Sequence, residues 1–148
     1  MKADVFLDSN VILYAAGNVE KEAAKKEIGL RLIAEIDFGT SVQVLGEFYD
    51  NARRKAKLAI PSETTAEIIR RLKRRPMVEE TVALFDEALA IAERYGIRYY
   101  DAAIIAAAKE LGARTVYSED LSHGQDYDGV KVVNPFLELE AQAAPPSP

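Results

Sequence analysis

Short apolar segments that alternate with amphipathic helices limit what this chain can fold into. Strands are predicted over residues 5–7, 41–42, 115–117 and 130–133, and helices over 11–16, 20–37, 44–52, 62–75, 81–95 and 101–111. This alternation predicts an α/β fold with a mostly parallel central sheet flanked by helices. Gly39, Gly96 and Gly112 are expected to end the helices that precede them, and Ser62 to cap the helix that it opens.

The length of 148 residues fits one domain, which we expect to span residues 1–137. Residues 138–148 are rich in Ala and Pro and are predicted to form a disordered tail. The chain has no cysteine, which excludes disulfides and thiolate metal sites. Its N-terminus lacks a signal peptide, and the longest apolar run, residues 102–108, is too short for a membrane helix. We therefore expect a cytoplasmic protein with no membrane role.

Positive charge is concentrated in one segment of an acidic chain. The net charge is −5, yet residues 53–75 hold nine basic and two acidic residues and carry +7. The remaining residues, ten basic and twenty-two acidic, carry −12. This segregation is typical of a surface that faces a polyanion. The simpler interpretation is a pair of solvated helix faces, and charge alone favours it.

Three aspartates fall at junctions between predicted elements. Asp8 follows the strand at 5–7, Asp120 follows the strand at 115–117, and Asp101 opens the helix at 101–111. Ligands of open α/β sheets bind at the carboxyl ends of the strands, so these side chains are expected at one edge. Taken singly, each aspartate could equally be a helix cap or a turn residue.

Glu47 is a fourth candidate and lies on a polar strip of its predicted helix, between Gln43 and Asn51. Alone it could be an ordinary solvated residue. Four carboxylates gathered together would repel one another unless a cation were present. Oxygen ligands of this kind suit Mg²⁺ or Mn²⁺.

Other catalytic chemistries lack the residues they need. The single histidine, His123, lies in a Ser-His-Gly turn, which is typical of surface structure. The glycines are scattered and form no phosphate-binding loop. No serine lies in the G-x-S-x-G setting of a hydrolase nucleophile.

Four segments resemble the motifs of PIN-domain nucleases, and more narrowly of VapC-type toxins from toxin–antitoxin pairs. They are Phe6-Leu7-Asp8-Ser9-Asn10, Gln43-Val44-Leu45-Gly46-Glu47-Phe48, Tyr100-Asp101-Ala102-Ala103-Ile104 and Tyr117-Ser118-Glu119-Asp120-Leu121. The resemblance covers residues 4 to 136, and Asn134-Pro135-Phe136 matches a closing segment of bacterial members. One departure is His123, where the pattern often has an aromatic residue.

The resemblance implies a single PIN-like domain that cleaves RNA internally with Mg²⁺ or Mn²⁺, leaving a 5′-phosphate and a 3′-hydroxyl. It assigns the catalytic and metal-ligand roles to Asp8, Glu47, Asp101 and Asp120, and supporting roles to Ser9, Ser118 and Glu119. Glu119 and Asp120 both remain candidates for the last ligand. A homodimer and a cognate antitoxin are implied as partners.

Two alternatives come from other classes. One is an RNA-binding or scaffold module without toxin activity, which metal-dependent cleavage would exclude. The other is a phosphohydrolase of small phosphoesters with Asp8 as nucleophile. That class expects an Asp-x-Asp pattern, and this chain has Asn10 at the second position.

Overall fold

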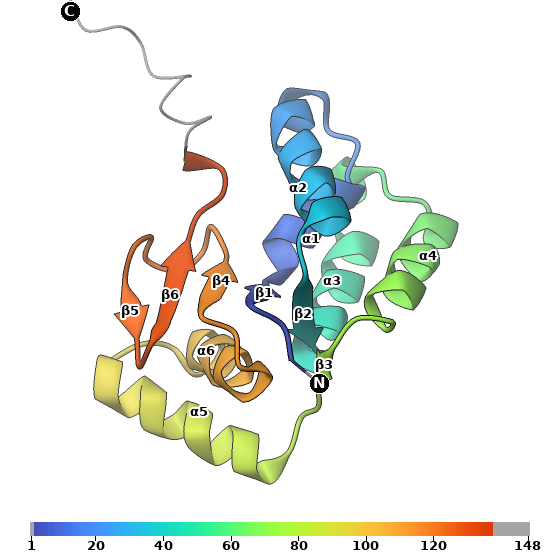
Figure 1. Cartoon of the computed structure of the whole chain (residues 1–148). Coiled ribbons are helices and arrows are strands. Elements are labelled where there is room, and N and C mark those ends of the chain that lie inside the picture. The colour runs from blue at the N-terminus through green and yellow to red at the C-terminus, as the bar shows by residue number, and fades with distance from the viewer. Residues whose placement is uncertain (1, 138–148) are drawn as a thin grey trace, which may run out of the picture.

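A six-stranded sheet in the order β3-β2-β1-β4-β6-β5 runs through residues 2–137 (Figure 1). The structure is a computed structural model and describes those residues; the predicted tail, 138–148, lies outside the described residues. The strands are β1 (Val5–Leu7), β2 (Phe38–Ser41), β3 (Met77–Val78), β4 (Thr115–Tyr117), β5 (Asp126–Tyr127) and β6 (Val130–Val133). All neighbours pair in parallel except β5 and β6. The predicted α/β fold with a mostly parallel sheet is confirmed.

Six α-helices connect the strands in the described part of the chain, and Figure 1 shows α5 and α6 together on one side and α1 to α4 grouped on the other. They are α1 (Ser9–Ala16), α2 (Ala23–Glu35), α3 (Val42–Arg54), α4 (Ser62–Leu72), α5 (Val82–Tyr95) and α6 (Tyr99–Leu111), with 3₁₀ turns η1 (Glu20–Glu22) and η2 (Ala56–Leu58). Every helix within residues 2–137 falls short of the length and apolarity that crossing a membrane requires.

One large part of the buried core lies where α6 packs across the sheet. Residues 102–108 of α6 are all buried, and most of them are alanines that allow the helix to approach the strands closely. Gly39 belongs to this contact, since a Cβ there would lie 2.7 Å from a methyl of Leu111 and 2.8 Å from the carbonyl of Pro76. The prediction that Gly39 ends a helix is wrong. The preceding helix ends at Glu35, and Gly39 lies inside β2.

Other helix boundaries also differ from prediction. α1 begins at Ser9 because the Asp8 carboxylate caps it, and it therefore starts two residues before the helix predicted over 11–16. Pro61, not Ser62, occupies the N-cap of α4. α6 begins at Tyr99, which makes Asp101 a residue of its first turn. The αL glycines that end α5 and α6 are as predicted, with φ of 64° at Gly96 and 79° at Gly112.

Candidate active site

The strand order reverses between β1 and β4, and the candidate site lies at their carboxyl ends. From the central β1 the chain builds outward through β2 and β3 on one side, and β4 begins the other. Such a reversal leaves a crevice where open α/β sheets bind ligands. Leu7 pairs with Tyr117, and the Asp8 amide donates to the Tyr117 carbonyl at 3.1 Å. Asp8 and Ser118 therefore leave the sheet side by side.

The Asp8 carboxylate is buried, with 5% of the residue exposed, and hydrogen-bonded on both oxygens. Oδ1 accepts from the Ser9 amide at 2.7 Å, and Oδ2 accepts from the Ser118 hydroxyl at 2.8 Å. Ser118 is itself fully buried. The fold thus fixes the position of this carboxylate.

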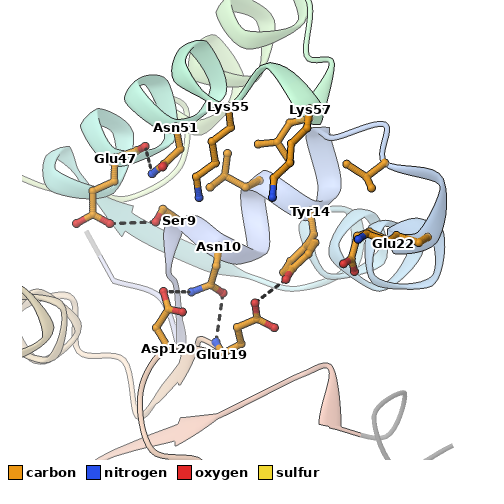
Figure 2. Close-up of a pocket in the computed structure, with 14 residues that line it drawn as sticks. Ser9, Asn10, Tyr14, Glu22, Glu47, Asn51, Lys55, Lys57, Glu119 and Asp120 are labelled. Atoms are coloured by element: carbon orange, nitrogen blue, oxygen red, sulfur yellow. Dashed lines mark hydrogen bonds between the residues drawn. The ribbon is translucent and has the colours of Figure 1, made fainter. Parts of the chain in front are cut away.

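Asn10 connects the two loops that carry the aspartates. Its side-chain amide donates to Ser118 Oγ at 3.2 Å and to Asp120 Oδ2 at 3.1 Å, while its oxygen accepts from the Glu119 amide at 3.2 Å. Figure 2 shows the bonds from Asn10 to both acidic residues. The start of α1 and the loop after β4 are therefore held together by one buried amide.

Glu47 reaches the same region from α3. Its carboxylate accepts from the Ser9 hydroxyl at 3.0 Å and from Gln43 Nε2 at 2.8 Å (Figure 2 shows the first bond). Ser9 therefore contacts two of the acids, Asp8 through its amide and Glu47 through its hydroxyl.

All four predicted carboxylates line one pocket of about 340 Å³. Asp101 enters it from the first turn of α6, and the pocket is completed by four further residues, which are Asn51, Arg98, Tyr100 and Ile104. The structure thus brings together side chains that are separated by more than a hundred positions in the sequence.

The acids interact electrostatically. Burial is the main cause that raises the pKa of Asp8 to about 7, with further contributions from Glu47 and Asp120, while hydrogen bonds from Ser118 and Ser9 oppose the shift. Burial also raises the pKa of Asp101, and Asp120 adds to this effect while Arg98 opposes it. A pocket that disfavours its own negative charges is suited to a positive ligand.

Glu119 points away from the pocket that the four acids line. Its two carboxylate oxygens accept from the Tyr14 hydroxyl at 2.6 Å and from Lys25 Nζ at 3.0 Å. Burial and the bond to Glu119 raise the pKa of Tyr14 to about 12, which keeps the phenol protonated as a donor. These contacts favour Asp120 over Glu119 as the candidate metal ligand in the loop after β4.

The donor set fits a hard divalent cation in chemistry, since it consists of carboxylate oxygens. Within residues 2–137, no three acidic or histidine side chains converge tightly enough to hold an ion as they stand. Asp8 and Glu47 accept hydrogen bonds on both carboxylate oxygens, and Asp120 accepts one on Oδ2. Side-chain rotations that exchange some of these bonds would be needed to close the shell around an ion.

Comparison with known proteins decides the family. The family model of the PIN domain matches residues 5–125. The chain belongs to the PIN-domain family. No curated protein matches this PIN domain by sequence comparison.

Solved structures that resemble this PIN domain include one bacterial toxin and two bacterial toxin–antitoxin complexes. A toxin–antitoxin complex from Klebsiella pneumoniae matches with a TM-score of 0.61 and 13% identity, over 88% of this chain and 97% of the other. VapC20 of Mycobacterium tuberculosis, a toxin that cleaves the sarcin-ricin loop, matches with a TM-score of 0.61 and 23% identity, over 77% of this chain and 88% of the other. VapBC2 from Rickettsia felis, bound to promoter DNA, matches with a TM-score of 0.57 and 17% identity, over 86% of this chain and 96% of the other. Identities this low establish the fold alone.

Two residues that act on the carboxylates of this PIN domain were given no role from the sequence, and they are Asn10 beside the pocket and Arg98 in its lining. Asn10 carried a signal, because it directly follows Asp8 and Ser9 in the first motif, but its bonds to residues 118–120 depend on the fold. Arg98 carried none, since a lone arginine before a helix is ordinary. Its charge acts on Asp101, three residues further along at the start of α6, and both residues line the pocket.

Proposed function

We propose that this PIN domain is an endoribonuclease dependent on Mg²⁺ or Mn²⁺ and acts as the toxin of a toxin–antitoxin pair. PIN-domain membership implies a nuclease. The observation that carries the proposal is the pocket at the reversal point of the sheet, which Asp8, Glu47, Asp101 and Asp120 all line. Four carboxylates that line one pocket repel one another unless a cation neutralises them.

A divalent cation held by these carboxylates would activate a water for attack at phosphorus and neutralise charge on the phosphate. Asp8, Asp101 and Asp120 are the proposed ligands, with Glu47 on the α3 side of the pocket. Ser118 and Asn10 orient Asp8 and Asp120 by hydrogen bonds, as outer residues of metal sites commonly do. Ser9 fixes Glu47 in the same manner.

RNA is the proposed substrate on two grounds. One of the similar structures is that of a toxin that cleaves an RNA loop, the sarcin-ricin loop. The carboxylate pocket also lies beside exposed lysines of the basic segment, as a polyanionic strand requires.

The decisive experiment measures cleavage of single-stranded RNA by the full chain with Mg²⁺, with Mn²⁺ and with EDTA. Asp8→Asn is expected to lower cleavage by about 1000-fold or more, since it removes a ligand charge while keeping the side-chain volume. The matched control is Asp37→Asn, an exposed aspartate between α2 and β2 outside the pocket, which should cleave like the parent. Metal-independent cleavage, or full activity of Asp8→Asn, would contradict the proposal.

The toxin role rests on the kind of protein that this fold resembles. Two similar structures are toxin–antitoxin assemblies, one from Klebsiella pneumoniae and one from Rickettsia felis. The test is the gene immediately upstream, where a short reading frame with a DNA-binding head is expected. Its product should co-purify with this chain and block RNA cleavage; cleavage unaffected by a bound product would contradict the toxin role.

A homodimer is proposed on the exposed face of α5. Val82, Phe85 and Leu89 are 78%, 47% and 45% exposed, and their spacing places them on one side of the helix. An apolar stripe of this kind usually marks an interaction surface. Phe85→Glu combined with Leu89→Glu should yield a monomer in light scattering, and a parent that is already monomeric would contradict the dimer.

A further inference from the structure

A second pocket of about 370 Å³ continues the carboxylate pocket along α3 (Figure 2). The two pockets share Glu47, Asn51 and Asp120, so they form one groove with the acids at one end. Lys55 and Lys57 follow on the same wall, and Figure 2 shows their amino groups directed into the groove, toward Asn10 and Tyr14.

These two lysines are distinct within the basic segment at 53–75. Both are exposed, and neither forms an ion pair or side-chain hydrogen bond with another of the described residues 2–137. Most of the arginines in the segment are engaged on other surfaces, Arg53 with Ser62, Arg54 with Asp50, Arg70 and Arg71 with Glu67, and Arg75 with the Phe38 ring. Lys73 and Arg74 do not line the groove. The positive charge that this segment directs at the site is therefore that of Lys55 and Lys57.

The opposite wall of the groove tolerates a polyanion. Lys21 and Glu22 both line it, so that their opposite charges offset each other, and the nearby Glu119 is neutralised by its ion pair with Lys25. Leu13 and Leu58 add an apolar surface beside the lysines. Cationic groups next to an apolar surface match the two parts of a nucleotide, a phosphate and a base.

We propose that Lys55 and Lys57 bind the backbone phosphates of single-stranded RNA next to the bond that is cut, and so fix the side from which the strand leaves the carboxylates. This inference rests on the proposed ribonuclease function and specifies where its substrate lies. Lys55 and Lys57 are positioning residues, because they act on neighbouring phosphates and do not contact the reacting one.

The test separates binding from cleavage. In an Asp8→Asn background with Mg²⁺ present, a fluorescein-labelled mixed-sequence RNA of about 12 nucleotides is titrated in fluorescence polarisation. Lys55→Gln combined with Lys57→Gln should weaken binding by roughly tenfold and reduce the slope of log K against log salt by about 1.4, or about 0.7 for each phosphate that no longer meets a lysine. Lys55→Arg combined with Lys57→Arg should bind within about twofold of the parent, because this variant keeps both charges.

The matched control is Lys73→Gln combined with Arg74→Gln, which removes the same charge from the same segment outside the groove. Its binding should stay within about twofold of the parent. An equal loss of affinity in both Gln variants, or no loss in either, would overturn the proposal. So would a Lys55 and Lys57 dependence seen with hexaglutamate but not with RNA, since the groove would then be a peptide site.

In the protein with Asp8 intact, Lys55→Gln combined with Lys57→Gln should raise KM for RNA cleavage and leave kcat unchanged. If RNA binding depends on the two lysines but no cleavage is seen at all, the nuclease function alone is refuted.

Discussion

The two sides of the carboxylate pocket are built differently. On the strand side, Asp8 and Ser118 are buried and joined by a hydrogen bond, and Asn10 ties them to the loop after β4. On the helix side, Glu47 and Asp101 are half-buried, and Asp101 has no side-chain hydrogen bond to another residue within 2–137. The fold alone therefore positions the strand side. On the helix side, bonds from Ser9 and Gln43 hold Glu47, whereas the final position of Asp101 depends on what the pocket binds.

The largest difference between the two sides should be seen in the pH dependence of stability without metal. The pKa of Asp8 is raised to about 7 in the folded protein, from an ordinary value of 3.8. The folded state therefore holds this proton more tightly than the unfolded state. The stability from this group is fully present below about pH 4 and is lost as the pH rises through 7, a change on the order of 4 kcal/mol at most.

This is measured by urea unfolding in EDTA between pH 4 and 8, comparing the parent with Asp8→Asn. The free energy of unfolding should fall more steeply with pH in the parent, because only the parent carries this titrating group. Asp37→Asn should follow the parent curve, since that exposed carboxyl does not line the pocket. Parallel curves for the parent and Asp8→Asn would show that the strand side does not strain its carboxylate.

Metal binding should join the two sides and is the next largest effect. Mn²⁺ at 100 times its dissociation constant should stabilise the parent by about 2.7 kcal/mol through mass action, and so raise Tm. Asp8→Asn combined with Asp101→Asn removes one acid from each side and should abolish the rise. An equal rise in this variant would place the ion elsewhere on the chain.

A smaller effect comes from the hydroxyls that support each side. Ser118 is fully buried and bonds Asp8, while its oxygen accepts from the amides of Asn10 and Asp120. Ser118→Ala should therefore lower the free energy of unfolding by roughly 1–3 kcal/mol, because it leaves buried groups without a partner. Ser9→Ala removes one part-buried bond to Glu47 and should cost about 1 kcal/mol or less. Equal costs in urea unfolding would contradict the asymmetry.

The fold could be predicted where a single element carries its own signal. The apolar run at 5–7 and the αL glycines at 96 and 112 depend on local chemistry, and the structure confirms them. The two-residue strands β3 and β5 were missed because pairing with a neighbour, not residue pattern, defines them. Gly39 was misread because its close contact with Leu111 joins positions far apart in the sequence.

The candidate site divides in the same way. Placement after strands predicts Asp8 and Asp120, and both line the pocket. Asp101 was also predicted from its junction, at the start of a helix, whereas Glu47 depended on the family motif. Helix packing brings both side chains to the same pocket. Which of two adjacent acids faces the pocket could not be read from the sequence, since it depends on the partners that Glu119 finds on α1 and α2.

The adjacent acids give the prediction with the smallest effect on stability. Glu119 binds Tyr14 and Lys25 outside the carboxylate pocket, and a partly exposed ion pair of this kind contributes about 1 kcal/mol or less. Glu119→Gln should therefore change the free energy of unfolding only slightly and keep RNA cleavage within about threefold of the parent. Asp120→Asn, one position along, should lower cleavage by about 100-fold or more while leaving stability near the parent value. RNA cleavage and urea unfolding are measured for both variants. A larger loss of cleavage in Glu119→Gln than in Asp120→Asn would assign the ligand role to Glu119.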